Sequence, residues 1–123
     1  MSAGEDPYAR VRAACLAQDS ATERMSHGEA AWFAKNGRQF ATAADRHHDA
    51  RRALWIAAPA GAQEALVEGD PARFFRPPYV GHRGWLGVRL DGDPDWAEIA
   101  ELCEDAYRVV APRTLVAKLD AAG

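Results

Sequence analysis

The sequence has little cysteine and no long apolar run. Its two cysteines, Cys15 and Cys103, are too few for the disulfide framework of a small secreted protein. No segment approaches the roughly 20 apolar residues that a membrane-spanning helix needs. The first ten residues are polar and acidic, without the basic and then apolar pattern of a signal peptide. We therefore expect a cytoplasmic protein without membrane contact, in which both cysteines are buried thiols.

Sequence motifs of common enzyme and metal sites are also missing. The chain has no Gly-x-Ser-x-Gly elbow, no Walker A sequence and no Gly-x-Gly-x-x-Gly loop. Ser26-His27 is not spaced for activation of a serine, and it favours a turn before the first strand. His47-His48 lacks the spacing of zinc ligands. The run 91–95 begins like a calcium loop, but no glutamate closes the loop. We expect no catalytic residue, no metal and no cofactor.

The charge is unevenly distributed along the 123 residues. The net charge of −3 excludes a generally basic nucleic-acid coat. Residues 23–89 carry ten Lys or Arg against seven acids, whereas residues 90–123 carry three against eight. All four histidines lie in the middle block. Two interpretations stay open: a solvated acidic helix of no consequence, or a polarised molecule with one basic side that faces anions.

Apolar periodicity and helix caps predict four helices, one of them in the middle of the chain. Asp6-Pro7, Asp70-Pro71 and Asp93-Pro94 are helix-start signals, because the carboxylate accepts from free N–H groups and proline lacks one. The predicted helices cover residues 7–18, 59–68, 95–110 and 113–119.

Strands are expected in the middle block. Asn36-Gly37 lies between two apolar runs and favours a two-residue type I′ hairpin turn. This turn pairs Phe33 with Phe40, Trp32 with Ala41, and Ala31 with Thr42. Further strands are expected at 53–58, with Trp55 and Ile56 on opposite faces, and at 79–80 and 84–90 around the turn Gly81–Gly84. The order α-β(3)-α-β(2)-α indicates one α+β domain over 1–123, core about 7–119, with an antiparallel sheet and helices packed on one face.

Two segments carry candidate binding residues. The segment Asp45–Arg52 is interpreted as a solvated connection, as an anion-contacting loop or, least of all, as a metal site. The segment Arg73–Trp85 is interpreted as a hydrophobic linker, or as one that keeps its rings inside and presents basic groups on a turn. The candidate contact residues in the two segments are the basic groups Arg46, Arg51, Arg52, Arg76, His82 and Arg83.

Five stretches of the chain resemble the MmcQ/YjbR family of small bacterial proteins. They are SHGEAAWF (26–33), GRQFAT (37–42), LWIAAP (54–59), RFFRPPYVGHRGWLGVRLDG (73–92) and EDAYRVVAP (104–112). The resemblance implies a sheet similar to that of type III secretion chaperones. It also implies DNA binding through two β-hairpin wings, without catalytic residues. Placed on this sequence, the wing turns are 35–38 and 81–84.

The resulting hypothesis is weak, largely non-specific DNA binding through phosphate contacts. About four or five contacts on a shared face would give micromolar or poorer affinity at physiological salt. The alternatives are a protein- or peptide-binding or self-associating module, and, less favoured, an enzyme that uses His27, His47 or His82. The candidate nucleic-acid contacts are Lys35, Asn36, Arg38, Arg46, Arg51, Arg52, Arg76, His82 and Arg83.

Overall fold

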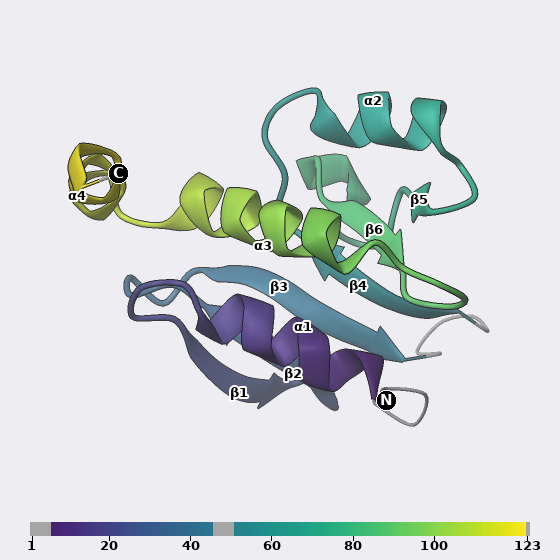
Figure 1. The fold of residues 1–123 in the computed structure, drawn as a ribbon, viewed down its shortest axis with the longest axis horizontal. Coiled ribbons are helices and arrows are strands. Elements are labelled where there is room, and N and C mark those ends of the chain that lie inside the picture. The colour runs from purple at the N-terminus through teal and green to yellow at the C-terminus, as the bar shows by residue number, and fades with distance from the viewer. Residues whose placement is uncertain (1–5, 46–50, 123) are drawn as a thin grey trace.

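The computed structural model describes residues 6–45 and 51–122. It contains four α-helices, six strands and one short 3-10 helix (Figure 1). Their bounds, in chain order, are α1 (Pro7–Leu16), β1 (Thr22–Ser26), β2 (Glu29–Phe33), β3 (Gln39–Asp45), β4 (Arg52–Ile56), α2 (Ala62–Gly69), β5 (Phe74–Phe75), η1 (Gly81–Arg83), β6 (Leu86–Arg89), α3 (Trp96–Val110) and α4 (Arg113–Ala122).

The strands form one antiparallel sheet in the order β1-β2-β3-β4-β6-β5. Helices α1 and α3 pack against each other, and α3 also contacts β3 and β4, so both cover one face of the sheet (Figure 1). Helix α2 lies beside β5. The predicted α+β class with an antiparallel sheet is confirmed. None of the helices in the described part of the chain is long and apolar enough to span a membrane.

One strand, β1, is absent from the predicted order. Its sequence Thr-Glu-Arg-Met-Ser is polar and short, so it lacks the apolar signal of a strand. It pairs with β2 across His27-Gly28, and both turn residues have positive φ, 54° and 82°. These angles are those of a type I′ turn. Ser26-His27 thus belongs to a turn, as predicted, but the turn joins two strands instead of preceding the first.

The prediction of a type I′ turn at Asn36-Gly37 is wrong. Only Gly37 of this pair has positive φ, 84°, and the Ala34 carbonyl accepts from the Gly37 N–H at 2.9 Å. This is a type I turn followed by a left-handed glycine, which makes a three-residue loop. Trp32 and Ala31 pair as predicted, but Phe33 pairs with Gln39.

The extra residue in β3 is Phe40, which forms a bulge. In a bulge two successive side chains point to nearly the same side of the sheet. Phe40 therefore joins Ala41 on the helix-covered face, where its ring meets Tyr107 edge-on with 5.5 Å between centroids. Both residues are fully buried.

The core lies between the sheet and helices α1 and α3. The cysteines meet there as free, buried thiols, as predicted, with 3.9 Å between the sulfurs of Cys15 and Cys103. The cap at Asp6 is confirmed, since its carboxylate accepts from the Tyr8 N–H at 3.0 Å. The cap of α3 is Asp95 instead of Asp93, because the Asp95 side chain accepts from the Glu98 N–H.

The segment between α2 and β6 differs most from prediction. Asp70 ends α2 instead of starting a helix, and α2 begins at Ala62, three residues after the predicted start at Pro59. On the side away from β4, β6 pairs with β5, whereas Tyr79-Val80 forms no strand. Pro77 and Pro78 have no N–H donor for a sheet ladder. The predicted hairpin turn Gly81–Gly84 is a 3-10 turn instead.

Candidate functional site

The structure gathers some of the predicted contact residues at one end of the sheet. Ala41 pairs with Ile56 and Ile56 with Leu86. The β2–β3 turn, which precedes β3, and η1, which precedes β6, therefore lie at the same end of the strands. We call this end, defined by residues 34–38 and 81–84, the turn end. Six predicted contact residues are exposed there: Lys35, Asn36, Arg38, His82 and Arg83 within these segments, and Arg76, whose side chain lies beside Gly81.

Asn36 at the turn end has a structural role. Its Oδ1 accepts from the Arg38 N–H at 3.0 Å, and its Nδ2 donates to the Val110 carbonyl at 2.8 Å. The first bond shapes the turn, and the second ties it to the last residue of α3. Both polar atoms of the side chain are therefore occupied inside the chain.

Arg51 and Arg52 lie at the opposite end of the strands, because Arg52 pairs with Asp45, the last residue of β3. The Arg52 guanidinium lies 3.3 Å from the Asp45 carboxylate and 3.7 Å from that of Asp6. The Arg51 guanidinium carbon is 3.8 Å from the centre of the Phe75 ring. Arg46 lies outside the described residues. The structure does not bring Arg51 and Arg52 together with the turn end.

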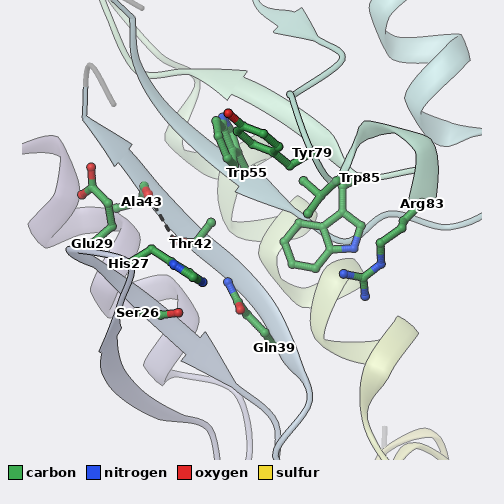
Figure 2. Close-up of a pocket in the computed structure, with 11 residues that line it drawn as sticks. Ser26, His27, Glu29, Gln39, Thr42, Ala43, Trp55, Tyr79, Arg83 and Trp85 are labelled. Carbon is green, nitrogen blue, oxygen red and sulfur yellow. Dashed lines mark hydrogen bonds between the residues drawn. The ribbon is translucent and has the colours of Figure 1, made fainter. Parts of the chain in front are cut away.

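A groove of about 550 Å³ crosses the sheet face opposite α1 and α3 (Figure 2). Thr42 pairs with Trp55 and Trp55 with Gly87, so these residues share the face that the helices leave open. The segment 79–85 forms one wall of the groove. The residues that line the groove are Ser26, His27, Glu29, Gln39, Thr42, Ala43, Trp55, Tyr79, Val80, Arg83 and Trp85.

Aromatic rings form much of the groove. Trp55 is half-buried, Trp85 is buried, and Tyr79 is 71 % exposed. Tyr79 has a φ of 65°, which a bulky residue rarely adopts. A largely exposed aromatic residue on strained backbone indicates a functional constraint. The Arg83 guanidinium carbon lies 5.4 Å from the Trp85 ring centre, so the cation is held at this wall.

The two ends of the groove carry different polar side chains. Arg83 and Gln39 line it at the turn end, and Gln39 directly follows Arg38. His27 and Glu29 line it at the opposite end, where a Glu29 oxygen accepts from the Asp45 N–H at 3.1 Å. Thr42, at mid-groove, has its hydroxyl 3.2 Å from the Ala30 and Ala43 carbonyls.

The described histidines do not converge. His27 lies in the β1–β2 turn and His82 in η1, at opposite ends of the strands. His47 lies outside the described residues. Among residues 6–45 and 51–122, no three His, Cys, Asp or Glu side chains group to hold a metal ion. Neither observation tests whether the protein is an enzyme, and its lack of catalysis stays a prediction.

The fold and the sequence agree on a family. The YjbR family model matches residues 16–109. The chain belongs to the YjbR family. The match runs from the end of α1 into α3, so it includes the whole sheet, the turn end and every lining residue of the groove.

A YjbR-like fold is also found among solved structures. The crystal structure of Deinococcus radiodurans protein DR2400, with the family-model domain DUF419, is similar with a TM-score of 0.70 and 17 % identity. The alignment covers 86 % of this chain and 81 % of that one. At this identity the likeness concerns the fold alone. A comparison with curated proteins gave no match.

Sequence reasoning missed the groove for a physical reason. The alternation in β4 correctly placed Trp55 opposite Ile56. The wall beside Trp55, however, includes Tyr79, and the sequence predicts a strand at Tyr79-Val80. The Pro77-Pro78 pair was the available signal against that strand, since neither residue can donate to a ladder.

Proposed function

We propose that this YjbR-family protein binds DNA weakly through the turn end. The supporting observation is which of its cationic side chains form ion pairs with carboxylates. Among the described residues, no carboxylate pairs with Lys35, Arg38, Arg76 or Arg83, whereas ion pairs engage five arginines elsewhere: Arg12, Arg52, Arg73, Arg89 and Arg108. Cations without carboxylate partners remain available for phosphates.

The size of the cationic set limits the affinity. Four phosphate contacts give a slope of log K against log salt of roughly −3.6 on duplex DNA. Contacts of this number, without a helix for the major groove, predict micromolar or weaker binding with little sequence preference. Helix α3 does not contribute, because exposed acids such as Glu101, Glu104 and Asp105 on it repel phosphates.

Charge reversal at the turn end tests the proposal. Labelled duplex DNA is titrated at low salt and followed by fluorescence anisotropy. The double variant R38E/R83E is expected to lose binding. The control R10E/R89E makes the same charge change, with Arg10 on α1 and Arg89 at the opposite end of the strands, and is expected to bind much like the parent.

Three results would contradict the proposal. The first is that R38E/R83E binds DNA as well as the parent. The second is that the control loses as much binding as the turn-end variant. The third is that the parent shows no salt-dependent binding. Thermal unfolding of both variants checks that the fold persists.

A second candidate function is self-association through the sheet edge. Among the strands that the structure describes, β1 has a single neighbour, β2, and Met25 on it is 68 % exposed. An edge strand can pair with a strand of a second copy. Light scattering is expected to show salt-insensitive dimers that Met25→Lys weakens. A monomer at all concentrations and salts excludes this candidate.

A further inference from the structure

We propose that the groove binds a nucleotide unit with an unstacked base, as found in a single strand. The base would lie against Tyr79 and Trp55, and the phosphate would meet Arg83. This inference rests on the proposed nucleic-acid binding and makes it specific. It assigns the single strand, instead of the duplex, as the preferred form.

The walls of the groove suit a flat ring. Three aromatic residues, Trp55, Tyr79 and Trp85, line it, and Figure 2 shows that they come from β4 and from the segment that precedes β6. Aromatic platforms bind unstacked bases by stacking, with little dependence on sequence, because every base has a π-face. The volume of about 550 Å³ lies in the range of small-ligand sites.

The charge of the groove is placed for a phosphate. Arg83 is a lining residue, and its guanidinium is directed along the groove wall beside Trp85 (Figure 2). Gln39 is another lining residue, and the exposed Arg38 and Lys35 precede it closely in the β2–β3 turn. A strand that leaves the groove at the turn end therefore passes further cations. A neutral or cationic peptide would gain nothing from this path.

The shape of the site disfavours a duplex. A paired base is stacked between its neighbours, and its ring faces are closed to a protein. Trp55 is half-buried on the sheet and Trp85 is buried, so a base reaches these two rings only by entering the groove beside the exposed Tyr79. Only a base outside a helical stack can enter the groove. Polar side chains at its rim and floor, such as Ser26 and Gln39, can hydrogen-bond to base edges.

The experiment compares three probes on the full chain. A labelled 12-residue oligo-dT, a duplex of equal length and free dTMP are titrated at low salt, with anisotropy and tryptophan fluorescence as signals. The single strand is expected to bind at least tenfold more tightly than the duplex and to change the tryptophan fluorescence. Equal or tighter binding of the duplex overturns the inference but leaves the proposed function standing. Loss of all nucleic-acid binding overturns both.

Variants of the groove test the placement of the base. Tyr79→Ala and Trp55→Leu are each expected to weaken single-strand binding about tenfold with little effect on the duplex. Tyr79→Phe keeps the ring and is expected to bind like the parent. Trp96→Leu is the matched control, because Trp96 is half-buried at the start of α3 and does not line the groove.

The remaining measurements decide whether the groove binds a free nucleotide, a single strand or a peptide. Binding of dTMP that responds to the same variants supports the nucleotide site, and a tighter oligonucleotide assigns the strand as its source. Unchanged single-strand binding in both Tyr79→Ala and Trp55→Leu overturns the groove placement. Binding of an acidic, Phe-containing peptide that Tyr79→Ala weakens, without any binding of oligo-dT, also overturns it and assigns a peptide to the groove. Tyr79 is exposed, so its variants remain informative if Trp55→Leu does not fold.

Discussion

The Nδ2 of Asn36 donates a hydrogen bond to the carbonyl oxygen of Val110, at 2.8 Å. The two residues are 74 positions apart in sequence. The bond fixes the β2–β3 turn, which carries Lys35 and Arg38, to the end of α3. A carbonyl in the last turn of a helix has no partner within that helix, so the side chain also satisfies α3.

Replacement of Asn36 tests this tie. Asn36→Ala removes both side-chain bonds and is expected to lower the free energy of unfolding by about 1 to 2 kcal/mol. Asn36→Asp keeps the acceptor for the Arg38 N–H but places a carboxylate oxygen against the Val110 carbonyl at the negative end of α3, so a loss at least as large is expected. Urea denaturation measures both, with Lys35→Ala as an exposed control in the same turn. Equal stability of Asn36→Ala and Lys35→Ala would show that the tie contributes nothing.

Gln63 is expected to hold the groove wall. It is 3 % exposed, and its Nε2 donates to the carbonyls of Gly81 at 2.8 Å and Trp85 at 2.6 Å. Gln63→Leu leaves both carbonyls without this donor and should cost about 1 to 3 kcal/mol. The amide exchange of segment 81–85 should also become faster. Glu64→Gln is the exposed control, and slow exchange in Gln63→Leu would contradict this role.

The buried thiols are expected to resist alkylation. A hydrogen bond from the Cys15 thiol to the Cys103 sulfur, followed by burial, raises the pKa of Cys15 above its usual range. The thiolate is the reactive form, so the folded protein should react slowly with iodoacetamide near neutral pH. In urea both cysteines should react at the rate of a free thiol. Fast alkylation of Cys15 under native conditions would argue against this packing.

Alkaline pH is expected to destabilise the fold through Tyr8. Burial, together with the Asp45 carboxylate, raises the pKa of Tyr8 from 10.0 to about 12. Between these values the unfolded chain loses the proton and the folded chain keeps it. This stabilising contribution is complete below pH 10 and disappears as the pH rises toward 12. Urea denaturation from pH 8 to 11 should show the decline.

The variant Tyr8→Phe separates this effect from other alkaline changes. It removes the acceptor of the Ala53 N–H, at 3.1 Å, so it should be less stable at neutral pH. Its stability should nevertheless decline less steeply above pH 10. A decline as steep as that of the parent would exclude Tyr8 as the cause.

Backbone strain at Tyr79 predicts that glycine is more stabilising than alanine at this position. With a φ of 65°, an L residue with a Cβ is disfavoured there by about 1 to 2 kcal/mol, whereas glycine is not. Tyr79→Gly should therefore be more stable than Tyr79→Ala, although glycine usually costs stability. Thermal unfolding of the two variants compares them without the ring. A more stable alanine variant would mean that the strain is absent.

The sequence predicted the fold class well because apolar periodicity extends over many consecutive residues. The helix at 95–110, for example, needed no tertiary information. Local turn geometry was harder. Asn36-Gly37 has the stronger type I′ composition, yet the Asn36 bonds to Arg38 and Val110 accompany a different turn. The type I′ turn formed at His27-Gly28, where no apolar strand signal preceded it.

The candidate site was predicted only in part, for a related reason. Exposed cations such as Arg38 and Arg83 are visible in a sequence, but their partners are not. Asp6 and Asp45 engage Arg52, and only the folded chain brings Asp6 to it. The groove joins β4 to a segment that has no regular pattern, so periodicity cannot reveal it.

The pairing of Ile56 with Leu86 has a consequence for how this protein can change. The chain leaves β4 after Ile56 and returns beside it, as β6, at the residue directly opposite. Residues 57–85 thus form a detour between neighbouring strands, in which β5 pairs at the outer edge of the sheet and the following segment supplies Tyr79 and Arg83 to the groove. Exposed positions between β5 and β6, such as His82 and Arg83, lie outside every strand pairing. Ligand preference can therefore be altered there, by selection or by design, without changing the order of the strands.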